Sequence, residues 1–200
     1  MSDSSNAAAR VKALLPSRKG HFRLESGHHG ALWLDLEKLC YDVAPVRELA
    51  FELAKRVESH DIDAVCGPLV EGAYVALFVA EALGVPFLYS TREEGRNENG
   101  LYTFQYRVPG ALHGAAGGKR IAIVNDVINA GSAVLGTLEH LEALRATVPV
   151  MASLAVLGER AGAFCEERGV LLETLVTIPN EIYRACDCPL CAEGIPVTNN

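Results

Sequence analysis

The chain has little of three things: aromatic residues, basic residues and long apolar runs. Aromatic residues make up 6% of its 200 residues, with a single tryptophan, and 18 Lys and Arg face 25 Asp and Glu. The net charge of −7 leaves no basic stripe to follow a nucleic-acid backbone. No apolar run reaches membrane-spanning length, and residues 1–9 hold no apolar signal core. We therefore expect a cytoplasmic protein that binds neither nucleic acid nor a membrane.

Half of the residues are apolar and 22% are charged, which is typical of a globular chain with a full core. Its length suits a single domain over residues 1–200. Strand and helix patterns alternate, which predicts an α/β fold: a parallel sheet with helices on both faces. The expected helices cover residues 3–15, 46–59, 72–83, 134–144 and 160–168. The expected strands cover residues 21–26, 32–36, 64–66, 86–90, 101–108, 121–124, 150–157 and 171–178, with a polar loop at 91–100 and an irregular tail after 179.

The most informative segment runs from Arg120 to Val134. An apolar strand over 121–124 leads to a carboxylate, Asp126, and then to a turn of small residues at 129–132 before a helix begins. Free N–H groups and the helix dipole make such a turn an anion site. Asp126 can accept hydrogen bonds from sugar hydroxyls. One turn could thus hold both a phosphate and a ribose, although any βα turn of a doubly wound sheet would have a similar outline.

This segment resembles a known motif, because it keeps Asp126, Val127, Ile128, Ala130, Gly131 and Ser132, with Asn125 for an acidic residue and Asn129 for a threonine. It is similar to the motif that binds 5-phosphoribosyl 1-pyrophosphate (PRPP) in type I phosphoribosyltransferases, and most similar to its orotate phosphoribosyltransferase version. The resemblance implies the type I phosphoribosyltransferase fold with a small N-terminal hood, here about residues 1–40. It also implies that PRPP is bound by Asn125, Asp126, Asn129, Ala130, Gly131, Ser132 and Ala133.

Two earlier segments extend the resemblance. Residues 20–27 resemble the hood strand of orotate phosphoribosyltransferases, which implies that the base is contacted by Glu25, Trp33 and Leu34, together with Asn129. Ordinary core packing is the alternative for Trp33. The turn over residues 67–72 resembles the one that holds the pyrophosphate of PRPP, which implies binding by Gly67, Pro68, Glu71 and Gly72.

Residues 92–100 correspond to the flexible catalytic loop of the family, where Arg92 and Arg96 supply cations. Together with Asp126 they are the expected catalytic residues. Three positions that carry lysine in the family carry Glu25, Glu71 and Glu93 here. The pocket would then hold more metal, take a less anionic ligand, or have these glutamates pointing outward. Glu25 in particular is expected to weaken the binding of orotate.

The tail carries three cysteines, Cys186, Cys188 and Cys191, and the last two have the spacing of a metal knuckle. They could bind zinc, with a fourth ligand from Cys40, Cys165, a histidine or a second subunit. A turn with reduced thiols is the alternative, and all six cysteines are expected to be reduced. The pair His28 and His29 is expected to be a solvated loop.

The resemblance implies an enzyme that transfers ribose 5-phosphate from PRPP to a nitrogenous base, releases pyrophosphate and requires Mg²⁺. It further implies a homodimer in which the catalytic loop serves the neighbouring site. A non-catalytic nucleotide-binding or regulatory protein on the same fold is the alternative, because the expected lysines are missing.

Overall fold

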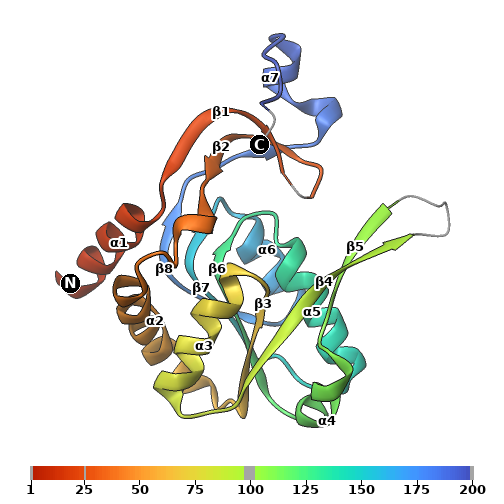
Figure 1. Ribbon diagram of the computed structural model, residues 1–200. Coiled ribbons are helices and arrows are strands. Elements are labelled where there is room, and N and C mark those ends of the chain that lie inside the picture. The colour runs from red at the N-terminus through yellow and green to blue at the C-terminus, as the bar shows by residue number, and fades with distance from the viewer. Residues whose placement is uncertain (1, 25, 97–101, 199–200) are drawn as a thin grey trace.

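The computed structural model describes residues 2–24, 26–96 and 102–198. Within them, six strands form a central sheet in the order β5-β4-β3-β6-β7-β8. Neighbouring strands run parallel, except that β4 and β5 form an antiparallel hairpin at one edge (Figure 1). Their bounds are β3 (Ala64–Pro68), β4 (Phe87–Arg96), β5 (Tyr102–Arg107), β6 (Ile121–Ile128), β7 (Val150–Leu157) and β8 (Leu171–Ile178).

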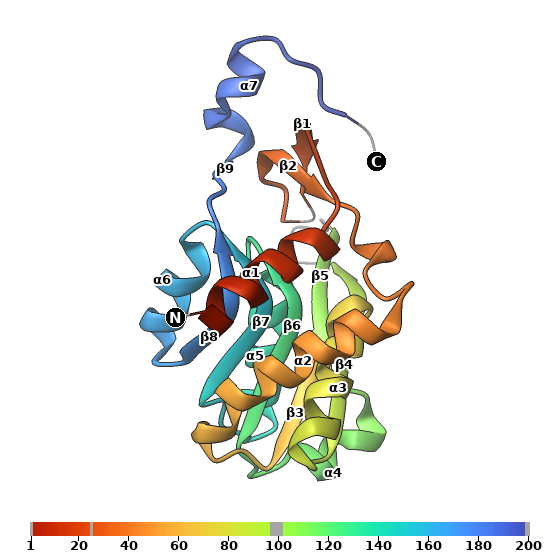
Figure 2. The same cartoon turned by 90° about the vertical axis from the view of Figure 1, so that its left-hand side faces the viewer.

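Helices cover both faces of this sheet, as the two views show (Figures 1 and 2). The alternation of β6 shows why: Ala122 and Val124 belong to the core on one face, whereas Ile121 and Ile123 belong to the core on the other. The first face carries α1 (Ser2–Leu14), α2 (Val43–Val57) and α3 (Glu71–Leu83). The second carries α4 (His113–Ala116), α5 (Ser132–Ala143) and α6 (Arg160–Arg168).

A second, antiparallel sheet forms the hood, in the order β1-β2-β9. It consists of β1 (Ser17–Arg23), β2 (His29–Leu34) and β9 (Ile182–Tyr183), so the N-terminal strands are joined by a strand from far along the chain. The tail continues through the short helix α7 (Pro189–Ala192) and lies beside the hood in both views (Figures 1 and 2). Single 3₁₀ turns occur at Leu36–Lys38, Glu58–His60, Gly110–Leu112 and Ala185–Asp187.

The prediction of a loop from residue 91 is wrong for its first half. Strand β4 continues to Arg96 and pairs with β5 in register from Thr91 opposite Arg107 to Arg96 opposite Tyr102. The hydrogen bonds of an antiparallel backbone pair stabilise this charged hairpin, so its strands do not need alternating apolar residues. Without that alternation the sequence did not predict the strand.

Helix α3 lies partly at the surface, since Tyr74 and Leu77 are 44% and 46% exposed. The tail is not irregular throughout, because Ile182 pairs with Gly30 of the hood. None of the helices in the described ranges has the length and apolar character needed to cross a membrane.

Candidate active site

A cleft of about 310 Å³ lies between the hood and the ends of β3 and β6. This is the carboxyl edge of the parallel strands, where ligands of open α/β sheets bind. The structure brings most of the expected site residues together here. Those lining the cleft are Trp33, Leu34, Pro68, Glu71, Gly72, Asn125, Asp126, Asn129, Ala130, Gly131, Ser132 and Ala133.

The turn between β6 and α5 forms one wall of the cleft. Gly131 has φ +87°, and a Cβ there would lie 2.4 Å from the ring of Phe164, so only glycine fits. Helix α5 begins directly after it at Ser132, without a side-chain cap. The first N–H groups of α5 are therefore left for an anion in the cleft.

The turn between β3 and α3 forms a second wall, and its Leu69–Val70 peptide bond is cis. Helix α3 begins at Glu71, again without a side-chain cap. Gly67 does not line the cleft; a Cβ on it would lie 2.5 Å from the Cβ of Ala76, so this glycine lets β3 and α3 pack closely. Two helix N-termini thus open into one cleft.

Asp126 lies at the floor and is 4% exposed. Burial raises the pKa of its carboxyl to about 7, the negative charge of Glu71 adds to this, and hydrogen bonding from the backbone of Val127 acts in the opposite direction. Its neighbour Asn125 donates from Nδ2 to the Val127 carbonyl at 2.8 Å. The cleft therefore holds a carboxyl that can gain or lose a proton near neutral pH.

The hood forms the roof. Trp33 is half-buried, and its ring lies 5.8 Å from that of Phe22 at a tilt of 39°. On the opposite side, Asn129 Oδ1 accepts a hydrogen bond of 3.3 Å from Asn180 Nδ2. An apolar ring and a hydrogen-bonded amide thus both line the cleft, a combination suited to a flat polar ring.

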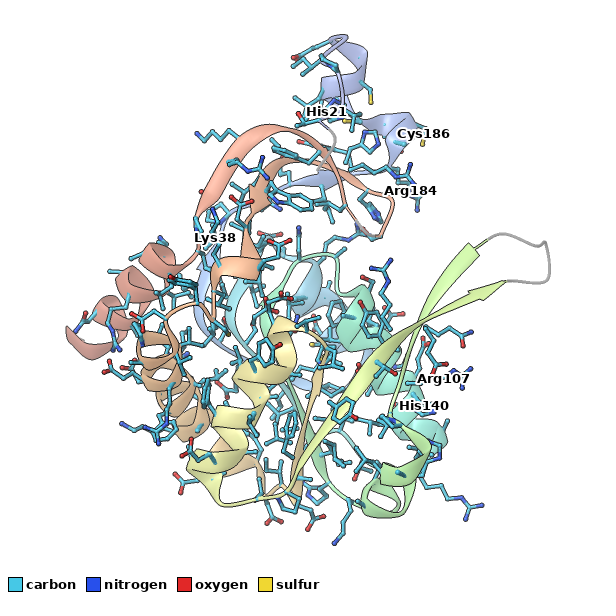
Figure 3. All side chains as sticks on the ribbon, viewed as in Figure 1. His21, Lys38, Arg107, His140, Arg184 and Cys186 are labelled. Carbon is cyan, nitrogen blue, oxygen red and sulfur yellow. The ribbon has the colours of Figure 1, made fainter. Side chains whose placement is uncertain are left out.

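Arg92, one of the two expected cations, does not line the cleft of its own chain. Arg92 is exposed on the β4–β5 hairpin and is absent from the lining residues, and Arg96 ends β4. Of the three glutamates, Glu71 lines the cleft, whereas Glu93 is exposed and pairs with Arg107 at 3.4 Å on the hairpin. Figure 3 shows Arg107 on the hairpin, far from the hood. Glu25 lies outside the described residues.

A group of four possible metal ligands lies outside the cleft, where the tail meets the hood. His21, His29, Cys188 and Cys191 place one ligand atom each within 4.8 Å of one another. Cys186, which was expected to be a third thiolate ligand, is exposed and does not belong to this group. The expectation of a solvated loop is wrong for His29, which is buried in β2. Its burial follows from the pairing of β2 with both β1 and β9.

Sequence reasoning missed several lining residues of the cleft. Glu37 follows the hood, and Tyr106 belongs to β5 at the base of the hairpin. Neither carries a local motif, so only the fold reveals them. Further apolar lining comes from Leu24, Leu32, Leu36, Leu69, Val70 and Leu157.

Comparison with known proteins agrees with this geometry. Residues 41–167 match the family model of the phosphoribosyl transferase domain. The orotate phosphoribosyltransferase of Desulforamulus reducens is 32% identical over 88% of this chain and 85% of its own length, and that of Pelotomaculum thermopropionicum is 34% identical over 88% and 86%.

Solved structures share the fold. The orotate phosphoribosyltransferase from Aeropyrum pernix aligns with a TM-score of 0.61 at 24% identity, over 88% of this chain and 93% of its own. Leishmania donovani UMP synthase aligns with a TM-score of 0.67 at 23% identity, over 88% of this chain and 36% of its own. Nothing in these comparisons supports a non-catalytic protein. The chain belongs to the phosphoribosyl transferase family and is an enzyme of the transferase class.

Proposed function

We propose that this enzyme transfers ribose 5-phosphate from PRPP to a nitrogenous base and releases pyrophosphate. The observation that carries the proposal is one cleft into which the N-termini of α3 and α5 open on either side of buried Asp126. PRPP has a phosphate, a ribose and a pyrophosphate in that order. The cleft offers one anion site, one carboxylate and a second anion site.

In this proposal, each wall of the cleft holds one part of the substrate. The turn over 129–133 and the first turn of α5 bind the 5-phosphate, and Asp126 accepts hydrogen bonds from the ribose hydroxyls. The turn over 68–72 binds the pyrophosphate. Trp33, Leu34 and Asn129 position the base against the reacting carbon, so that orientation supplies much of the rate.

PRPP would enter as its magnesium complex, so that Mg²⁺ is part of the substrate. The carboxylate of Asp126 fits this role, because Mg²⁺ prefers oxygen ligands. The metal would bring a cation to a cleft that has Glu71 where the resemblance leads us to expect a lysine. Stabilising the charge that develops on the departing pyrophosphate is the main electrostatic task.

Orotate is the first base to test, because the relatives named above are orotate phosphoribosyltransferases.

We place the enzyme in the cytoplasm. None of its six cysteines forms a disulfide, which fits a reducing compartment.

A homodimer is the second part of the proposal. Val70, Tyr74 and Leu77 lie on one face of α3 and its entry turn, and they are 51%, 44% and 46% exposed. An exposed apolar stripe beside a cleft is typical of an interface. Arg92 lies on the β4–β5 hairpin but does not itself line the cleft of its own chain, so we propose that it serves the cleft of the partner chain.

The activity is tested by pyrophosphate release from PRPP with orotate, uracil and purine bases, with and without Mg²⁺. We expect base-dependent release that requires Mg²⁺ and is lost in Asp126→Asn. Loss of one charged hydrogen bond to the ribose should cost about 1.5–3 kcal/mol of binding. Glu25→Lys should improve turnover of orotate more than that of uracil. No release with any base would overturn the proposal.

The shared site is tested by mixing. Arg92→Ala and Asp126→Asn should each be inactive alone, and equal amounts mixed and allowed to exchange should regain part of the activity. Light scattering should show a dimer that Leu77→Glu weakens. A mixture that stays inactive, although exchange is demonstrated, would restrict Arg92 to its own chain.

A further inference from the structure

We propose that His21, His29, Cys188 and Cys191 bind one zinc ion that fastens the tail to the hood. These residues come from β1, β2 and α7 with its preceding turn, and so unite segments more than 150 positions apart. Two thiolates and two imidazoles are a closed ligand set for structural zinc. Figure 3 shows His21 at the junction of hood and tail, with Cys186 to its right on the part of the tail that precedes α7.

The distances fit a tetrahedral ion. Around zinc with Zn–N of about 2.0 Å and Zn–S of about 2.3 Å, nitrogen and sulfur ligands lie about 3.6 Å apart. Here Cys188 Sγ lies 3.5 Å from His21 Nε2, and Cys191 Sγ lies 3.7 Å from His21 Nε2 and 3.3 Å from His29 Nδ1. The two nitrogens are 2.9 Å apart and would need to separate by only about 0.4 Å.

A backbone contact prepares His21 as a ligand. Its Nδ1 lies 2.7 Å from the carbonyl oxygen of Ile195, and a carbonyl only accepts, so Nδ1 carries the proton. In the neutral ring, Nε2 then presents its lone pair to the other three residues. Metal-binding histidines commonly donate their second N–H in this way, which fixes the tautomer and the orientation of the ring.

The tail has little else to hold it. Between Arg184 and Thr198, Cys188 is the only buried residue, and α7 contributes none to either apolar core. Backbone bonds join Thr198 to His21 and Ile182 to Gly30. Small segments that bury so little apolar surface usually need a disulfide or a metal. A zinc ion supplies this link at the point where the segments cross.

The consequence reaches the cleft. Residues Leu24, Leu32, Trp33 and Leu34 of the hood line its roof, and β1 and β2 carry the two histidines. Zinc would therefore hold the roof over the ribose and base, as a structural ion without an open coordination position. The role is one of positioning, because the cluster lies outside the cleft.

The test is elemental analysis of the full chain, purified without chelator or added metal. We expect about one zinc per chain in the wild type, and less than about a tenth of that in the double variant Cys188→Ser/Cys191→Ser. Cys186→Ser is the matched control: it removes a neighbouring thiol outside the cluster and should keep the zinc. The ligand set would be overturned if Cys186→Ser lost as much zinc as the double variant, or if the double variant kept its zinc.

Cobalt substitution gives a readout that needs no variant. Replacement of the metal by Co²⁺ should produce thiolate charge-transfer bands and the intense absorption bands of a tetrahedral ion, as two sulfur ligands require.

Hydrogen exchange is a separate measurement. Removal of the metal by a chelator should raise the exchange rate in residues 17–34 and 182–198 and leave β6 and β7 unchanged. A Cys188–Cys191 disulfide by mass spectrometry, or a metal-free protein with free thiols and a protected hood, would refute the proposal. These readouts use no substrate and are independent of the proposed reaction.

Discussion

The Asn125 side chain lies directly against the Cα of Gly72. A Cβ on residue 72 would lie 1.9 Å from Asn125 Oδ1, and the amide of Asn125 is itself bonded to the backbone of Val127. The start of α3 and the end of β6 are thus in contact through one glycine, so the two turns proposed to bind the phosphate groups of PRPP are coupled.

Gly72→Ala tests this contact. The added methyl must displace Asn125, so we expect a loss of about 1–3 kcal/mol in unfolding free energy and a large rise in KM for PRPP. Gly162→Ala in α6 is the control, because a Cβ there meets nothing within 4 Å; it should stabilise by about 0.5–1 kcal/mol and leave KM unchanged. Urea unfolding and steady-state kinetics measure both. Unchanged kinetics in Gly72→Ala would show that the turns tolerate separation.

Asp126 makes stability depend on pH. Its pKa is about 7 in the folded chain against an ordinary 3.8, so between these values the folded state holds a proton that the unfolded state has lost. The unfolding free energy therefore falls as pH rises toward 7. Asp126→Asn removes this fall, and its stability advantage over the wild type should grow by about 2–3 kcal/mol between pH 5 and pH 8. Urea unfolding across this range measures it, and an advantage that does not vary with pH would contradict the assignment.

Glu71→Lys should strengthen PRPP binding. The change replaces a negative charge in the cleft, beside the proposed pyrophosphate site, by a positive one. We expect KM for PRPP to fall about tenfold, since a partly exposed site is screened, and the pKa of Asp126 to fall as its repelling neighbour is removed. Glu81→Lys reverses an exposed charge at the other end of α3 and should leave KM unchanged. A rise in KM in Glu71→Lys would favour Glu71 as a magnesium ligand.

Trp33 reports on the roof, because it is the only tryptophan of the chain. Binding of a base or a nucleoside 5′-monophosphate should quench its fluorescence by contact with the ring, whereas pyrophosphate alone should not. Trp33→Phe should remove the signal and keep part of the activity. If nucleotides did not change the fluorescence spectrum, Trp33 would be a residue that only packs against Phe22 within the hood.

Local patterns predicted the sheet and the floor of the cleft well. Strands β7 and β8 and helix α6 have the predicted bounds, because each is a continuous pattern that ends at glycine or proline. Asp126 and Gly131 could also be recognised, since a strand, a carboxylate and a small-residue turn lie together in the sequence.

Features that depend on distant pairing could not be predicted. The cysteine spacing indicated two of the four possible metal ligands, Cys188 and Cys191. His21 and His29 join this group only because β1, β2 and β9 pair with one another. Gly67 is a second example. The sequence predicted that it would line the cleft, but glycine is required there because Ala76 of α3 approaches it closely. Contact between segments, rather than residue type, decides these roles.

The hood sheet joins residues 17–34 to residues 182–183, and Thr198 bonds to His21. During translation β1 and β2 can pair with each other early, but β9, the third strand of the hood, is made more than 140 residues later. The central sheet, complete once residue 178 has emerged, can form first and present an open cleft. The two turns that border the cleft can thus form before its roof is complete, and the cleft becomes enclosed only after residues 182–198 have been made.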